Sequence, residues 1–526
     1  MVVGLEGPIP DALVRIQTSD LQIRTDLEGK FSFEDIDYAT PLTVTAWKAG
    51  YFIAGVFEVA IGEDNIEIHL EPHNMIDNPD YSWLPSLFHP GEGENQGCAE
   101  CHSSSGSKLS YPLPVDEWLL DGHSQTALNP RFLTMYTGTD IYGNKSPLTQ
   151  YGNSRDYGTF PLPPDPDLPY YGPGYKLDFP ETDGNCAACH TPAASVNNPY
   201  AIDPSTVAGI SAEGVPCDFC HKIWDIKLDE QDMPLQNMPG VLSYEFLRPP
   251  DGHQLFLGPY DDVAPGEDTY SPLQTQSEFC SGCHFSTFWD TVIYNSYGEW
   301  LDSPYSNPET GQTCQDCHMP KTGNSHFALP DQGGLNRGSG TISSHQMPGA
   351  SSEELLQNTV SMDVQTQQDQ DQILVIVKIT NDQAGHHVPT DSPLRHLILL
   401  VTAENSAGDQ LKQLSGPTTP DWTGIGDPNQ GYYANLPGKA YAKILQEKWT
   451  QISPTGSYWN PTIIISDNRL AAFETDTTTF AFQSPPGQAA TIKVTLLFRR
   501  AFIELMDQKG WTDPDILMEE EVLLLP

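Results

Sequence analysis

The stretch GQTCQDCHMP, residues 311–320, decides how this chain folds, because a histidine directly follows two cysteines that lie three residues apart. The same C-x-x-C-H spacing occurs in CAECH, CAACH, CDFCH and CSGCH. Together the five copies use all ten cysteines, and since only 15 of 526 residues are histidine, chance does not explain five such neighbours. We number the copies in chain order: motif 1 is Cys98, Cys101 and His102; motif 2 is Cys186, Cys189 and His190; motif 3 is Cys217, Cys220 and His221; motif 4 is Cys280, Cys283 and His284; motif 5 is Cys314, Cys317 and His318.

This spacing is the attachment signature of c-type haem. Cysteines at i and i+3 lie on one side of a single helical turn, so each thiol can add to one of the two vinyl groups on one edge of a haem. The following imidazole then reaches the iron as the proximal ligand. We therefore expect five covalently attached haems, one on each motif.

Two other uses of paired cysteines fit less well. Zinc ribbons need four cysteine or histidine ligands in two paired half-sites, and five C-x-x-C units do not pair evenly. A disulfide scaffold gives no reason for the histidine to recur. The sequence favours haem over both.

The formal charge is −45, from 70 acidic and 25 basic residues. Such a surface repels nucleic acid and anionic lipid, which excludes both as partners. It suits cationic partners, bound divalent ions such as calcium, or mineral surfaces; solubility in a salty medium is an equally good explanation. No run of 18 or more apolar residues occurs, so we expect no transmembrane segment.

Three segments are expected: a β-sandwich at residues 1–75, a mostly irregular multihaem core with short helices at 76–350, and a second β-sandwich at 351–526. DALVRIQ, FSFEDI, LTVTAWKAGY and IEIHLEPH alternate apolar and polar residues, as β-strands do. Pro, Gly and Tyr are plentiful in the middle segment, and sequences typical of strands, such as DQILVIVKITN, follow it. The first segment resembles the carboxypeptidase regulatory-like β-sandwich, and the matching positions are Asp26, Gly29, Phe31, Phe33, Gly50 and Tyr51.

Ten histidines outside the motifs could supply the sixth iron ligands. Those in loops are the better candidates, and we expect every iron to carry two histidines. Met319 adjoins His318 and so cannot reach the opposite face of the same iron. The predicted distal ligands are His89, His123, His253, His345 and His386, with His326 and His387 in reserve, whereas His69, His73 and His396 lie in or beside strands and are expected to be structural.

CAECH with EWLLDGHSQTA, SEFCSGCH with YGEWLDSPY and TCQDCHMP, SHQMPGA and AGHHVPT together resemble the cytochrome c-554-like multihaem c-type cytochromes. The resemblance spans roughly residues 80–400 and implies closely stacked, mostly bis-histidine haems and an exported protein. The first residues lack the basic and apolar regions of a secretory signal. We expect that a signal peptide has been removed, and that the protein is extracellular or on the cell surface, or else periplasmic.

The function expected is electron transfer between other redox proteins or to an extracellular acceptor, with no catalytic residues. The alternative is a multihaem oxidoreductase that acts on a nitrogen or sulfur compound at one open haem; it calls for basic residues, in which the chain is poor. A mainly adhesive role ranks last.

For assembly we weigh a monomer, in which a histidine of the carboxy-terminal sandwich caps a haem of its own chain, against a conductive head-to-tail filament bridged by His386, His387 or His89.

Overall fold

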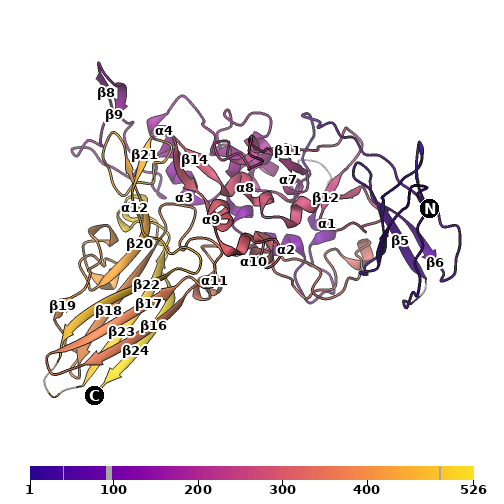
Figure 1. The fold of residues 1–526 in the computed structure, drawn as a ribbon. Helices are drawn as coiled ribbons and strands as arrows, with labels where there is room; N and C mark the ends of the chain where they lie inside the picture. Colours follow the sequence, from indigo (N-terminus) through magenta and orange to yellow (C-terminus); the bar gives the residue numbers. More distant parts are fainter. Residues whose placement is uncertain (40, 91–96, 485–486, 488) are drawn as a thin grey trace.

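The computed structural model describes residues 1–39, 41–90, 97–484, 487 and 489–526. The chain forms three parts in a row: a small β part at the amino terminus, a central part that carries the five motifs, and a large β part at the carboxy terminus (Figure 1). This is the multidomain, β-rich architecture with an irregular short-helix core that the sequence predicts.

The amino-terminal part consists of two small sheets that enclose an apolar core. Alternating side chains of β3 (Leu13–Ile16) and β5 (Leu42–Trp47) point into this core, and Val14, Val44 and Ala46 are fully or almost fully buried. The first sheet has the order β2 (Gly7–Pro8), β1 (Val2–Gly4), β7 (Ile68–His69), and the second has the order β4 (Gln22–Arg24), β3 (Leu13–Ile16), β5 (Leu42–Trp47), β6 (Ala54–Val59).

One expected strand of this part has no partner. FSFEDI forms no β-ladder, yet Phe31 and Phe33 pack against the core. The alternation of apolar residues therefore predicted correctly that Phe31 and Phe33 face the core, but they do so without strand pairing.

The amino-terminal part is fixed to the central part by polar contacts. Arg15 forms an ion pair with Asp261 at 2.6 Å, and the backbone N–H of Thr18 donates to the Asp262 carboxylate at 2.7 Å. The backbone N–H of Ile53 donates to the Asp268 carbonyl at 2.9 Å. These contacts hold the two parts in one orientation.

The central part contains short helices and two-stranded sheets. Each motif lies on a helix of about one or two turns. The motif helices are α1 (Ala99–His102), α5 (Ala187–His190), α7 (Cys217–Cys220), α8 (Glu278–His284) and α10 (Cys314–His318). The others are α2 (Pro114–Trp118), α3 (Pro130–Thr137), α4 (Tyr175–Asp178), α6 (Pro192–Ser195) and α9 (Ser296–Leu301). The helix α11 (Glu353–Gln357) follows them and packs its buried Leu356 into the core of the carboxy-terminal part. The strand pairs are β8 (Tyr151–Ser154) with β9 (Gly158–Pro161), β10 (Ile223–Ile226) with β11 (Tyr244–Phe246), β12 (Phe256–Gly258) with β13 (Asp268–Tyr270), and β14 (Ser286–Phe288) with β15 (Thr291–Tyr294).

The carboxy-terminal part is a sandwich of two mostly antiparallel sheets with a continuous apolar core. Val375, Leu399, Phe480 and Leu496 in this core are completely buried. One sheet has the order β16 (Ser361–Gln368), β17 (Gln372–Thr380), β22 (Thr475–Gln483), β19 (Gln413–Ser415). The other has the order β21 (Thr462–Asp467), β20 (Gly438–Glu447), β18 (His396–Asn405), β23 (Ala490–Arg499), β24 (Ile516–Leu525), and α12 (Ile503–Lys509) follows β23.

Two buried lysines fasten this sandwich to the central part. The ammonium group of Lys509 donates to three carbonyl oxygens, those of Thr134 at 3.0 Å, Thr139 at 3.0 Å and Pro173 at 2.6 Å. Lys443 donates to the carbonyl of Ile293 at 2.6 Å. Because each ammonium satisfies buried carbonyls of the other part, separating the parts would leave these carbonyls unpaired.

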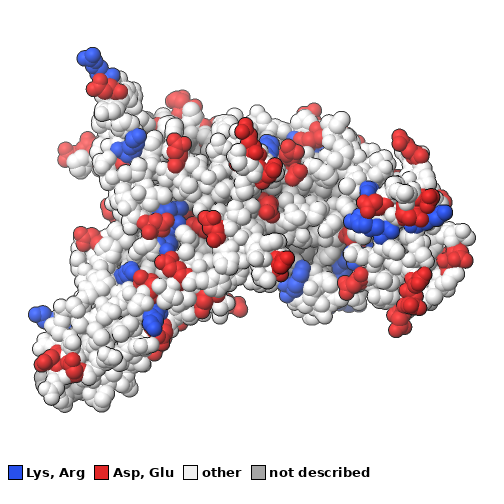
Figure 2. All heavy atoms as spheres, in the orientation of Figure 1, with Lys and Arg blue, Asp and Glu red and all other residues white. Residues whose placement is uncertain are grey.

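Acidic side chains are scattered over the visible face of all three parts, and basic ones are fewer (Figure 2). Within the described residues, no helix is both long enough and apolar enough to cross a lipid bilayer.

Candidate haem-binding site

All five motifs line one cavity in the central part. Its volume is about 1880 Å³, and its lining includes all ten cysteines and all five motif histidines. A pocket for a single small ligand is roughly 300–1,000 Å³, so this cavity has room for more than one such group. None of the ten cysteines forms a disulfide.

The motif helices present their thiols in the way the sequence predicts. In motif 5, Thr313 caps α10, and the carboxylate of Asp316 accepts from the backbone N–H of Thr313 at 2.9 Å. This capping box starts a helix at the first cysteine, so one turn carries both thiols and the histidine. The other motif helices are similarly short, and none has a comparable box.

Four of the five motif histidines hydrogen-bond to backbone. In each, the Nδ1–H group donates to a carbonyl oxygen, which leaves Nε2 as the free nitrogen. The carbonyl partners are Phe327 for His102 at 2.8 Å, Thr126 for His190 at 3.4 Å, Leu257 for His221 at 2.7 Å and Pro348 for His318 at 2.8 Å. A hydrogen bond of this kind, from the ring nitrogen that does not bind metal, fixes the ring orientation and is typical of metal-binding histidines.

Burial keeps most of these rings neutral. It lowers the pKa of His190 to about 4, against the smaller opposing effect of the Thr126 carbonyl. Burial also lowers the pKa of His102 and His221. Since iron binds the neutral ring nitrogen, these histidines are ready to coordinate at neutral pH.

Motif 4 differs from the others. Nδ1 of His284 lies 2.7 Å from the carboxylate of Asp391. Burial alone would lower the pKa of His284, but the charge and hydrogen bond of Asp391 outweigh it and raise this pKa to about 9. The same contact lowers the pKa of Asp391 despite its burial.

Two motif histidines face a second histidine across the cavity. The ring centroids of His284 and His123 are 6.3 Å apart with an interplanar angle of 72°, and those of His318 and His386 are 6.2 Å apart at 11°. Two imidazoles bound to one metal ion, with bonds of about 2 Å on each side, have centroids roughly 6 Å apart. Both pairs therefore have the spacing of a bis-histidine iron.

A third histidine, His345, lies near motif 3. It lines the cavity, and burial followed by the proximity of His221 lowers its pKa to about 4. It is thus a neutral imidazole close to the histidine that it would have to oppose.

The other predicted ligands lie elsewhere. His253 is 64 % exposed and lies 3.7 Å from Glu267. His89 is hydrogen-bonded through Nε2 to the carboxylate of Glu213 at 2.6 Å. Neither belongs to the described lining of the cavity.

Of the two reserves, His387 lines the cavity and lies 3.6 Å from Glu299. His326 hydrogen-bonds through Nδ1 to Tyr111 at 2.9 Å, outside the described lining.

The three histidines expected to be structural are not alike. His396 is completely buried and stacks on Phe502. His73 is buried against Phe52, and His69 is 70 % exposed beside Glu67.

Aromatic rings, rather than histidines, contact motifs 1 and 2. Phe132 stacks on His190 with centroids 3.6 Å apart, and Phe327 lies parallel to His102 at 6.0 Å. Among the described residues, no second histidine ring is in contact with either imidazole. The pairs therefore distinguish motifs 4 and 5, and to a lesser degree motif 3, from motifs 1 and 2.

The thiols show which motifs are neighbours. The thiols of Cys98 of motif 1 and Cys217 of motif 3 lie close enough to interact. Motif 4 has two such contacts, from Cys283 to Cys189 of motif 2 and from Cys280 to Cys314 of motif 5. Cys220 of motif 3 is also close enough to both thiols of motif 4 to interact electrostatically. Motif 4 therefore adjoins motifs 2, 3 and 5, whereas motif 1 adjoins motif 3.

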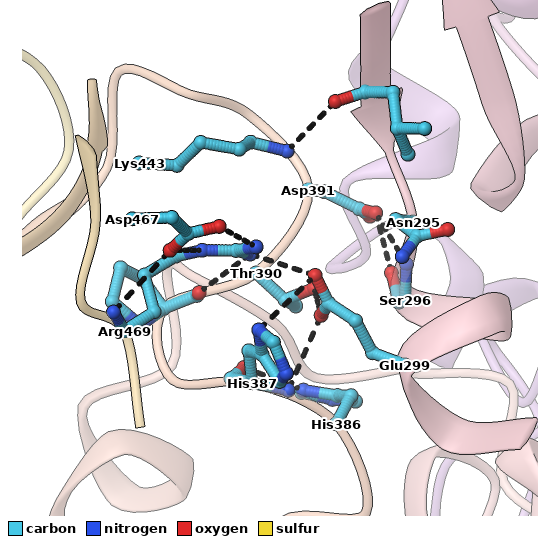
Figure 3. A network of polar contacts seen from close by, with 12 residues as sticks. Asn295, Ser296, Glu299, His386, His387, Thr390, Asp391, Lys443, Asp467 and Arg469 are labelled. Atoms are coloured by element: carbon cyan, nitrogen blue, oxygen red, sulfur yellow. Dashed lines mark hydrogen bonds and ion pairs between the residues drawn. The ribbon is translucent and has the colours of Figure 1, made fainter. Parts of the chain in front are cut away.

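One loop of the carboxy-terminal sandwich serves two motifs. Residues 381–395, between β17 and β18, carry His386 opposite motif 5 and Asp391 beside motif 4. Figure 3 shows this loop held by Glu299 of α9, which accepts from the N–H of His387 at 3.2 Å and pairs with Arg469 at 2.7 Å.

Sequence reasoning missed several residues of the site. Asp391 lies five residues after His386 in the same loop, but an aspartate in a loop is too common to signal a role. Arg131, Arg395 and Arg500 line the cavity, although the chain as a whole is poor in basic residues. No spacing in the sequence relates these three arginines to one another.

Three methionines, Met135, Met319 and Met347, also line the cavity. The first and last of these lie in α3 and in the loop that follows His345. The sequence prediction considered only Met319.

The donor set fits haem c on these motifs: paired thiols on single helical turns, imidazoles with a free Nε2, and a shared cavity. Among the described residues, no group of three or more His, Cys, Asp or Glu is arranged to hold a metal ion directly. That arrangement is unlike a zinc ribbon, in which the cysteines themselves surround the ion.

No protein-family model and no curated protein sequence matches this chain. Among solved structures, it is similar to the penta-heme cytochrome c552 from Thermochromatium tepidum, with a TM-score of 0.54 and 18 % sequence identity. The match covers 81 % of this chain and 97 % of that chain. The chain has the fold of a multihaem c-type cytochrome.

Proposed function

We propose that this protein transfers electrons through five haems, each bound covalently to one motif. The single observation that carries the proposal is the continuity of the site: thiol contacts join the motifs within one cavity. Each thiol pair would bind one edge of a haem, so motifs whose thiols lie close together would bring their haems close together. Electron tunnelling falls off exponentially with distance, and such contacts are what conduction requires.

The chain's own residues have three tasks in this function. The cysteines would hold each haem, the motif histidines would bind its iron, and His123, His345 and His386 would supply a second histidine at motifs 4, 3 and 5. The bound haems supply one-electron chemistry at iron. The apolar walls exclude water, which reduces the reorganisation that accompanies each transfer.

Denaturing mass spectrometry is the first test. We expect five haem additions and no free thiol; four or fewer would contradict the proposal. The intact protein should then show reversible reduction of all five haems in a spectroelectrochemical titration.

The ligand assignment is tested by substitution. His123→Ala and His386→Ala should each convert one haem from low-spin to high-spin in the oxidised protein, because each removes one of two axial imidazoles. His253→Ala is the matched control, since His253 lies on the surface. A high-spin signal in the His253→Ala variant would instead support the ligand role that the sequence predicts for it.

A second candidate function is reduction or oxidation of a small nitrogen or sulfur compound at an open haem. Two observations favour it: no histidine contacts the motif 1 and 2 imidazoles within the described chain, and Arg131, Arg395 and Arg500 line the cavity. Arginines near an open iron can bind an anionic substrate. Rapid binding of cyanide to one haem of the unmodified protein would favour this candidate; no binding would leave electron transfer alone.

For location and assembly we propose an exported monomer. His386 faces His318 of its own chain, so this loop histidine needs no second subunit. A filament would need a bridging ligand from elsewhere, such as His89. Electron microscopy decides between them: helical fibres would establish the filament, and isolated particles at every ionic strength would exclude it.

A further inference from the structure

The hydrogen bonds behind the axial histidines divide motif 4 from motif 5. At motif 5, both rings donate to backbone carbonyls: His318 to Pro348 at 2.8 Å and His386 to His387 at 2.9 Å. At motif 4, both rings donate to carboxylates: His284 to Asp391 at 2.7 Å and His123 to Asp121 at 2.7 Å. The two sites share their ligand type and spacing but differ in the charge of the acceptors.

Both carboxylates are held firmly. The side chain of Asp121 is 3 % exposed and that of Asp391 is 10 % exposed. Asp121 also accepts from the backbone N–H of His123 at 3.1 Å. Asp391 accepts from the N–H of Ser296 at 3.1 Å and from its hydroxyl (Figure 3). Neither side chain is free to turn away from its histidine.

A carboxylate acceptor makes an imidazole a stronger electron donor to its metal. The hydrogen bond is charge-assisted, and roughly twice as strong as one to a neutral carbonyl. A more basic imidazole stabilises Fe(III) relative to Fe(II), so it lowers the reduction potential. At motif 4 this happens on both faces of the iron.

We propose that Asp121 and Asp391 are positioning residues that give the haem of motif 4 the lowest reduction potential of the five. The inference rests on the proposed function, since it requires haem at this motif. Motif 4 adjoins motifs 2, 3 and 5, so its haem is the junction of the network. Electrons therefore fill the surrounding haems first, and movement between these arms passes through an uphill step at the junction.

Two cations oppose the effect of Asp391. Arg395 interacts with it electrostatically and has a hydrogen bond to the Thr390 carbonyl at 3.1 Å, and Lys443 is also within electrostatic range. They offset part of its charge at a distance, but they do not replace the direct hydrogen bond to His284. Arg395→Gln should accordingly shift the motif 4 potential further down.

The ring angles distinguish this haem from that of motif 5 by spectroscopy. Bis-histidine haems with nearly perpendicular rings give a highly anisotropic low-spin electron paramagnetic resonance signal, and nearly parallel rings give an ordinary rhombic one. The angle is 72° at motif 4 and 11° at motif 5. In a potentiometric titration of the full protein with five haems, the highly anisotropic signal should be the last to disappear on reduction.

Asp391→Asn and Asp121→Asn test the cause. Asparagine has the same shape, and it tolerates the left-handed backbone of residue 391 (φ 59°). Each variant should make reduction of the motif 4 haem about tenfold more favourable, which is about 59 mV for one electron. Asp391→Glu should restore most of the original potential.

Asp140→Asn is the matched control, because Asp140 is a buried carboxylate that accepts from the backbone N–H groups of Tyr142 and Asn144 rather than from a histidine. It should leave the lowest potential unchanged. The proposal is overturned if the lowest potential stays in place in both asparagine variants with five haems bound, or if the highly anisotropic signal is reduced early. A haem count below five would instead contradict the proposed function itself.

Discussion

The central part and the carboxy-terminal sandwich hold themselves together in different ways. The sandwich has its own core, in which residues such as Val375 and Phe480 are completely buried. The central part instead surrounds a cavity of about 1880 Å³ with short helices and loops. The sandwich is stabilised by its own side chains, whereas the central part, on the proposed function, is completed by the haems that its cysteines would bind.

The largest expected effect follows from replacing all ten cysteines by serine. Without haem, the apolar walls of the cavity of about 1880 Å³ face water, and each Å² of exposed apolar surface costs about 25 cal/mol. A domain is stable by only ~5–15 kcal/mol, so the central part should lose its structure. Limited proteolysis should cleave it rapidly and leave a fragment near residues 351–526. Equal cleavage of the haem-bound and cysteine-free proteins would show that the comparison is wrong.

The sandwich core gives the next largest effect. Phe480→Ala should lower the free energy of unfolding of the sandwich by about 3–5 kcal/mol, because it removes a completely buried ring. The haem spectrum should not change. Thr479→Ala, at the exposed neighbouring position, is the control and should stay within about 0.5 kcal/mol of the original. A changed haem spectrum in the Phe480→Ala variant would mean that the two parts do not fold independently.

Lys509→Met sharpens the comparison at the boundary between the two parts. It removes the donor for three carbonyl oxygens, and each unsatisfied buried acceptor costs about 1–3 kcal/mol. We expect a loss of about 3 kcal/mol, since water will reach some of these acceptors. Denaturant unfolding monitored by both haem absorption and tryptophan fluorescence should show the two transitions moving apart. A single unchanged transition would mean that Lys509 does not join the parts.

The smallest effect is expected at the surface. Lys493 and Glu520 form an ion pair at 2.8 Å between β23 and β24, and both side chains are more than a third exposed. Glu520→Gln should change the free energy of unfolding by no more than about 1 kcal/mol, and less at high salt. A larger loss of stability in thermal denaturation would mean that surface ion pairs, and not only the apolar core, stabilise the sandwich.

The alternating apolar and polar residues of the carboxy-terminal segment predicted the sandwich, because a strand with one face in the core buries every second side chain. The strand β17 does so over nine residues. The C-x-x-C-H motifs predicted the thiols and imidazoles of the cavity for a similar reason, because both cysteines and the histidine of each motif lie within five consecutive residues. His123, His345 and His386 were chosen because they lie in loops, and all three line the cavity. The same reasoning chose His253 and His89, which the structure places outside its described lining.

The sequence by itself determined what local chemistry determines: the number of motifs, the position of each thiol pair and the period of each strand. Only the tertiary structure decided which motifs are neighbours, which histidines face each other and which carboxylates stand behind them. His284 and Asp391 are 107 residues apart, and they meet because the loop of residues 381–395 is held against α9 by Ser296 and Glu299. Such contacts depend on how elements pack, and no spacing within one element records them.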